Sequence, residues 1–126
     1  MVQEKTEVYK CELCGNIVEV VHVGGGTLVC CGQEMTLLKE NDTDAAVEKH
    51  VPEVTVKDGT VEVVVGSVEH PMMDNHWIQF IELITPTRVL RADLNPGEKP
   101  KATFETDEKV VKVREYCNLH GLWVKA

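Results

Sequence analysis

Cysteine spacing constrains this chain more than any other feature of its sequence. Four of the five cysteines fall within the first 31 residues, and the fifth, Cys117, lies far from them. An odd count with paired spacing, in a chain whose N-terminus MVQEKTEVYK has no apolar signal segment, indicates metal ligation or redox chemistry more than a disulfide framework. We therefore expect a cytoplasmic protein with at least one metal site.

The first four cysteines form two pairs. Cys11 and Cys14 are a CxxC knuckle followed by a glycine, a spacing that turns both sulfurs toward one ion. Cys30 and Cys31 are adjacent, so both ligate one ion only if the backbone bends unusually there, which the following Gly32 would favour. Four thiolates predict a tetrahedral zinc or iron site, and spacing leaves the metal open. Structural zinc is common in such sites, a disulfide is less favoured, and the adjacent pair, unlike the knuckles of a zinc ribbon, favours iron.

Three regions follow from this pattern. Residues 1–38 are too short to hold a core of their own, so this unit needs a metal or a partner to fold. Residues 39–50 are polar and are predicted to be a linker, with one helical turn near Asp44–Val47. Residues 51–126 carry the pattern of a β domain.

Short strands dominate this last region. EVTVK, the Asp58-Gly59 turn and TVEVVVG predict a hairpin, because Asp-Gly suits the type I′ turn that joins twisted strands. Further strands are predicted at WIQFIELIT, TRVLRADL, KATFET and VVKVREYC. In the absence of a convincing long helix, the sequence favours an all-β protein with an antiparallel β-sandwich.

Charge and hydropathy exclude two classes of partner. The net charge of −8 argues against nucleic acid and against an anionic membrane, since both need clustered Lys and Arg. No apolar run reaches the roughly 18 residues of a membrane span.

Histidines suggest a second metal site. Four of the five lie at or near predicted strand ends, where the loops of a sandwich gather, and Cys117 lies three residues from one of them. A single histidine is more often a solvated side chain, and a lone cysteine more often a small buried hydrophobe. His22, beside the glycines, fits that ordinary role. Imidazoles with one thiolate suit iron, copper or zinc. The candidate ligands are His50, His70, His76, Cys117 and His120.

Two sets of motifs resemble a known family. CELCGNIVEVVHVGGGTLVCCGQEM is similar to the iron module of desulforedoxin. EKHVP, GSVEHPM, HWIQFIEL and REYCNLHGLW are similar to the catalytic domain of superoxide reductases. Together, and in this order, they resemble the two-iron desulfoferrodoxin family over essentially the whole chain.

The resemblance implies a fold, two iron ions and an activity. It implies a desulforedoxin-like module followed by an immunoglobulin-like β-sandwich, usually in a homodimer. The four N-terminal cysteines would bind one iron, and the four histidines would surround a second iron with Cys117 as axial ligand. The family reaction is the one-electron reduction of superoxide to hydrogen peroxide, with rubredoxin or a similar protein as electron donor.

Two residues beside His50 complete the predicted site. Lys49 would attract the superoxide anion to an acidic protein, and Glu48 would occupy the open iron position or order water for protonation. As an ordinary exposed ion pair they would have neither role. Where the family often carries Glu-Glu-Lys after His-Pro-Met, this chain has Met73-Asp74-Asn75, so a lysine near the site is missing.

Three other functions stay open at this point. The chain could be an iron electron-transfer protein, a zinc-stabilised β-sandwich binding module without redox activity, or a superoxide dismutase that uses the same iron. The four loop histidines with Cys117 argue against the first two.

Overall fold

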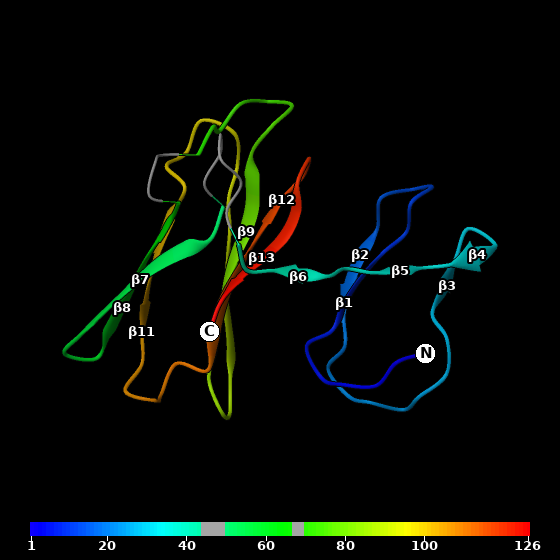
Figure 1. Cartoon of the computed structure of the whole chain (residues 1–126), viewed down its shortest axis with the longest axis horizontal. Helices are drawn as coiled ribbons and strands as arrows, with labels where there is room; N and C mark the ends of the chain where they lie inside the picture. The colour runs from blue at the N-terminus through cyan, green and yellow to red at the C-terminus, as the bar shows by residue number, and fades with distance from the viewer. Residues whose placement is uncertain (44–49, 67–69) are drawn as a thin grey trace. The chain divides into compact units, whose positions relative to one another are not determined.

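The computed structural model describes residues 1–43, 50–66 and 70–126. These residues form two compact units, Met1–Lys39 and Glu40–Ala126 (Figure 1). Every helix or strand among them is a β-strand, which confirms the all-β class. In this described part of the chain, no helix is long and apolar enough to cross a membrane. The helical turn predicted near Asp44–Val47 lies outside the described residues.

The first unit is a small β structure with little core. It contains a three-stranded sheet in the order β2-β1-β5 and a two-stranded hairpin of β3 and β4. Its core cluster has only three buried apolar side chains, Val2, Tyr9 and Val20. The strands are β1 (Val8–Lys10), β2 (Ile17–Glu19), β3 (Val29–Cys30), β4 (Gln33–Glu34) and β5 (Thr36–Leu37).

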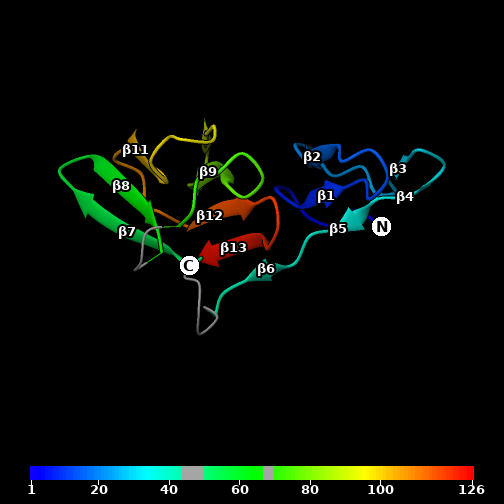
Figure 2. The same cartoon turned by 90° about the horizontal axis from the view of Figure 1, so that it is seen from above.

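The second unit is a sandwich of two sheets, seen as two layers in Figure 2. One sheet has the order β10-β9-β12-β13-β6 and the other β11-β8-β7; all pairs are antiparallel except β13 with β6. The strands are β6 (Glu40–Asn41), β7 (Pro52–Lys57), β8 (Thr60–Val65), β9 (Ile78–Ile84), β10 (Val89–Asp93), β11 (Lys101–Glu105), β12 (Lys112–Cys117) and β13 (Gly121–Lys125).

The hairpin of β7 and β8 forms as predicted. Asp58 and Gly59 connect the strands with φ angles of 48° and 78°, and positive φ at both central residues is the mark of a type I′ turn. Glycine tolerates this backbone because it has no Cβ, and aspartate tolerates it better than most residues.

The core is formed by every second side chain along the strands, since side chains alternate between the two faces of a sheet. Val61, Val63 and Val65 of β8 are fully buried and pack in one cluster with Val113 and Cys117 of β12. Because side chains alternate along a strand, residues two apart share a face. Glu115, midway between Val113 and Cys117, therefore also faces the inside of the sandwich, and it is fully buried.

A buried ion pair occupies the opposite face of β12. Arg114 is paired in register with Glu82 of β9, and its Nη2 donates to Glu82 Oε1 over 2.6 Å. Arg114 Nη1 also donates to Glu40 Oε2 of β6 over 3.2 Å. Glu40 accepts a further bond of 2.6 Å from Lys112. This network fastens the first residues of the second unit to its larger sheet.

Candidate metal centres

The four N-terminal cysteines converge as one cluster. Their sulfur atoms lie within 4.8 Å of one another, and none of the four is in a disulfide. Cys30 Sγ lies 3.6 Å from Cys14 Sγ and 3.9 Å from Cys31 Sγ. In a tetrahedron with metal–sulfur bonds of about 2.3 Å, neighbouring sulfurs are about 3.8 Å apart. The cluster therefore has the dimensions of a tetrahedral thiolate site.

The backbone bend that adjacent cysteine ligands require is present. Cys31 has a φ of 53°, an unusual value for a residue with a Cβ, and Gly32 follows with 78°. Two successive residues in the left-handed region turn the chain sharply after Cys30. The side chains of Cys30 and Cys31 thereby reach the same cluster, although neighbours in an extended strand would point apart.

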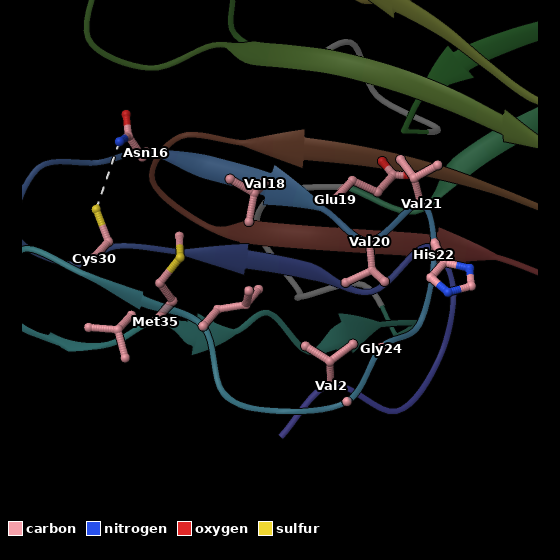
Figure 3. Close-up of a pocket in the computed structure, with 13 residues that line it drawn as sticks. Val2, Asn16, Val18, Glu19, Val20, Val21, His22, Gly24, Cys30 and Met35 are labelled. Atoms are coloured by element: carbon pink, nitrogen blue, oxygen red, sulfur yellow. Dashed lines mark hydrogen bonds between the residues drawn. The ribbon is translucent and has the colours of Figure 1, made fainter.

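Hydrogen bonds set the charge state of the thiols. The Cys14 backbone N–H donates to Cys11 Sγ over 3.5 Å, and this bond is the main reason that the pKa of Cys11 falls to about 6. Asn16 Nδ2 donates to Cys30 Sγ over 3.8 Å (Figure 3). Hydrogen bonding to the Cys14 side chain is the main cause that raises the pKa of Cys31 to about 12. Without metal at neutral pH, Cys11 is thus a thiolate and Cys31 a thiol.

Four histidine rings form a second cluster, in which each ring lies next to two others. Centroid distances are 4.6 Å from His50 to His70 and 4.8 Å from His70 to His76. They are 5.0 Å from His76 to His120 and 4.9 Å from His120 back to His50. Each ring thus adjoins two others, and Cys117 Sγ lies 3.7 Å from His120 Nδ1.

Strand ends bring these residues together. His50 lies two residues before the start of β7. His70 and His76 lie in the segment before β9, where His76 forms a β-bridge with Met73. Cys117 ends β12, and His120 lies in the turn to β13.

Burial and hydrogen bonds orient the rings. His50, His70 and His76 are buried, Cys117 is fully buried, and His120 is exposed. His70 Nδ1 lies 2.7 Å from the Pro71 carbonyl oxygen. Because a carbonyl only accepts, Nδ1 carries the proton and the Nε2 lone pair is left for a metal.

Two contacts to His50 could not be anticipated from residue types alone. Glu115 Oε2 lies 3.5 Å from His50 Nδ1, and the Trp123 ring stacks on His50 at 4.7 Å. Sequence analysis missed both residues. For Glu115 the signal was its position two residues before Cys117, which places both on one face of the strand.

Both clusters fit metal ions. His50, His70, Cys117 and His120 offer donor atoms that all lie within 4.8 Å of one another, and the His76 ring adjoins two of these rings. Four imidazoles and one thiolate exceed the four ligands of a structural zinc ion, and together they suit iron.

Family models match both units. The model described as "Desulfoferrodoxin, N-terminal domain" matches residues 3–38, and the model described as "Desulfoferrodoxin" matches residues 42–126. The chain belongs to the desulfoferrodoxin family. The resemblance seen in the sequence motifs is thereby confirmed.

Individual relatives agree with this membership. The desulfoferrodoxin of Syntrophotalea carbinolica is 60% identical over 120 residues, 95% of each chain. The desulforedoxin of Megalodesulfovibrio gigas is 69% identical over 29 residues, which are 23% of this chain and 78% of that protein. The crystal structure of the superoxide reductase from Treponema pallidum superposes with a TM-score of 0.81 at 28% identity, covering 95% of this chain and 97% of that one.

Family membership and the two clusters bear on the remaining predictions. The cysteine cluster and the histidine–cysteine cluster are consistent with the two iron centres of a desulfoferrodoxin. The predicted β-sandwich behind a small four-cysteine module is confirmed. His22 is exposed and belongs to neither cluster. Glu48 and Lys49 lie outside the described residues.

Proposed function

We propose that this protein is a superoxide reductase that converts superoxide to hydrogen peroxide at the histidine–cysteine centre. The reaction adds one electron and two protons to each superoxide. The closed arrangement of four histidine rings beside the buried Cys117 carries the proposal, because it offers five protein ligands to one ion. The proposed ligands are His50, His70, His76, Cys117 and His120.

The residues would divide the work as follows. A ferrous ion bound in this centre supplies the electron that superoxide receives. Neutral imidazoles keep the charge of the site low, so that the ligands themselves do not repel an anion. The Cys117 thiolate would donate electron density to a metal bound there. The exposed side of His120 leaves the centre open to a small substrate.

Two residues outside the described part of the chain complete the proposed mechanism. Lys49, adjacent to His50, would attract superoxide toward a protein of net charge −8. Glu48 would order the water that supplies protons, or would bind the metal when substrate is absent. Their position next to a proposed ligand supports both roles.

The first centre would receive electrons. We infer that Cys11, Cys14, Cys30 and Cys31 bind one iron, and that rubredoxin or a similar protein is the donor. Exposure of Cys14 and Cys31 supports this role, since electrons enter most readily where a centre approaches the surface. We propose the cytoplasm as the compartment, in keeping with five free cysteines.

We further propose that two copies of the chain associate through the first unit. This unit contains a pocket of about 510 Å³ with a mainly apolar lining (Figure 3). Val18, Val21 and Val29 contribute to the pocket and are 40%, 82% and 61% exposed. A unit with three buried apolar core residues gains most from covering such a surface. A second copy would supply a matching apolar surface.

The stoichiometry of the products tests the activity. The protein, loaded with two iron ions and reduced, is mixed with superoxide, and peroxide and dioxygen are measured together. A reductase yields one peroxide for each superoxide and no dioxygen, and it consumes one donor electron. Dioxygen evolution without use of donor electrons would indicate a dismutase instead. The His76→Ala variant serves as the control for the site, since it removes one proposed ligand and should abolish peroxide formation.

A further inference from the structure

Trp123 contacts two of the proposed ligand residues without being a ligand. Its ring stacks on the His50 ring with centroids 4.7 Å apart and planes inclined by 18°. Its Nε1–H donates to the backbone carbonyl of His120 over 3.1 Å. The rings of His50 and His120 are themselves neighbours, 4.9 Å apart. One indole therefore joins two adjacent members of the ring of four.

The strand register explains why Trp123 stands there. Trp123 of β13 lies opposite Glu115 of β12 in the antiparallel pair, so both side chains project from the same face of the sheet. That face is the inner one, which also carries Cys117. Glu115 Oε2 lies 3.5 Å from Nδ1 of His50. Glu115 and Trp123 therefore contact the His50 ring from two directions: the Glu115 carboxylate lies at the edge of the ring, and the Trp123 indole stacks on its face.

His50 depends on these contacts for its position because it precedes a strand of the opposite sheet. Cys117 and His120 belong to the hairpin of β12 and β13, so their spacing is set by one turn. His50 precedes β7, a strand of the opposite sheet. The position of its ring relative to Cys117 and His120 depends on packing between the sheets. A ring held in place before the metal arrives loses less conformational freedom when it binds.

We propose that Trp123 is a positioning residue of the histidine–cysteine centre. Its indole orients the His50 ring by stacking and holds the backbone of His120 by a hydrogen bond. Both histidine rings are therefore in position before the metal binds. This inference rests on the proposed function only in that His50 and His120 ligate the metal.

Two substitutions separate the two contacts. Trp123→Phe keeps an aromatic ring for stacking and removes the N–H donor, whereas Trp123→Leu removes both. Trp77→Phe is the matched control, since Trp77 is the other tryptophan of the chain and bonds to Asn118 through its backbone, which the substitution keeps. Because that control leaves Trp123 as the single tryptophan, its fluorescence also reports metal binding beside this ring.

The measurement is the affinity of the second centre for ferrous iron in the full chain, under anaerobic conditions and in competition with a chelator. We expect Trp123→Leu to lower this affinity by about 10- to 100-fold, the usual effect of losing a partner that orients a ligand. Trp123→Phe should fall between that variant and the wild type, and Trp77→Phe should match the wild type. The thiolate-to-iron absorption band should shift in Trp123→Leu and stay in place in the control.

Several results would overturn the inference. Wild-type affinity in both Trp123 variants would do so, as would an affinity loss in Trp123→Leu that is matched by an equal loss in the cysteine centre of the same molecules. If Trp123→Leu does not fold, wild-type affinity in Trp123→Phe overturns the hydrogen-bond role. Reduced affinity in that variant, with an unchanged thermal midpoint of the metal-free chain, supports it. A wild-type protein that binds no iron at the second centre would refute the proposed function instead.

Discussion

At the scale of single residues, the histidine–cysteine centre is organised by groups that are not ligands. The Pro71 carbonyl accepts from His70 Nδ1 over 2.7 Å and so selects the tautomer that presents Nε2. Glu115 Oε2 lies 3.5 Å from His50 Nδ1, within ion-pair distance. The protein thus places a polar oxygen beside Nδ1 of two of the four rings.

Replacement of the thiolate tests its place in the centre. In Cys117→Ser, a hydroxyl stands where a fully buried sulfur lies 3.7 Å from His120 Nδ1. We expect loss of the thiolate-to-iron charge-transfer band from the oxidised protein and a strong fall in the rate of superoxide reduction. Visible absorption checks this. Persistence of the band in the oxidised variant would exclude Cys117 as a ligand.

Substitution of Lys49 tests electrostatic attraction. Lys49→Ile removes a positive charge next to His50, so the first encounter with superoxide should slow by about 10-fold at low salt, and less at high salt, because salt screens the attraction. The iron content should stay at the wild-type value. Stopped-flow mixing at several ionic strengths measures both effects. An unchanged rate with unchanged salt dependence would reject the role.

The pKa values of the cysteine cluster predict proton release on metal loading. In the metal-free protein, hydrogen bonds raise the pKa of Cys31 to about 12 and also raise the pKa of Cys30, so both are protonated at pH 7. Metal ligands must be thiolates, so loading displaces these protons, and the affinity of the site should rise with pH above 7.

Calorimetry in buffers of different ionisation enthalpy measures the protons released. The His70→Ala variant, with its second centre weakened, isolates the cysteine site, and Cys31→Ser in that background provides the comparison. Heats that do not depend on the buffer would contradict the prediction.

At the scale of strands, the local sequence pattern predicted most strands of the second unit, but it did not predict the pairing between strands that are distant in the chain. Strands β7 to β12 were predicted from apolar alternation and turn residues, and the Asp58-Gly59 turn has the expected positive φ angles. Strands β6 and β13 were not predicted. Their parallel pairing joins residues about 80 positions apart, and nothing in the short segment Glu40–Asn41 signals its partner.

The same limit applies to the candidate site. Residue types and strand ends indicated which histidines could meet, because loops at one end of a sandwich converge. The order of the rings, the tautomer of His70 and the contacts of Trp123 depend on register and packing between the sheets. A sequence read one strand at a time does not contain them.

The buried ion pair between Arg114 of β12 and Glu82 of β9 links two strands, and its contribution to the stability of the second unit can be measured. Arg114→Leu leaves the fully buried Glu82 without its cationic partner, and we expect the second unit to lose about 3–5 kcal/mol of stability. The double variant Arg114→Leu with Glu82→Leu should recover most of that loss, since it buries no uncompensated charge.

Urea unfolding followed by tryptophan fluorescence reports on the second unit, because Trp77 and Trp123 both lie in it. Arg91→Leu is the matched control: its partner Asp93 is 73% exposed, and the change should cost at most about 1 kcal/mol. Equal losses in the single and double Arg114 variants would show that packing of the arginine, and not its charge, stabilises the strands.

At the scale of the whole molecule, the two units differ in how they are stabilised. The core cluster of the second unit has ten buried residues shared by two sheets, whereas the core cluster of the first unit has three, besides its group of four cysteines. A unit of 39 residues with so small a core depends on its metal or on a partner. The apolar pocket of the first unit is the surface that a second copy would cover.

A charge placed in that surface should therefore separate the copies. Val29 contributes to the pocket and is 61% exposed, so Val29→Glu should fold and retain both metal centres while burying a carboxylate in the proposed interface. We expect its dissociation constant for dimer formation to rise by at least 100-fold. Val56→Glu in β7 is the control, because Val56 is also 61% exposed but belongs to the second unit. Light scattering across a range of concentrations measures the mass. A wild-type chain that is monomeric, or a Val29→Glu chain as dimeric as Val56→Glu, would show that the apolar surface of the first unit does not join two copies.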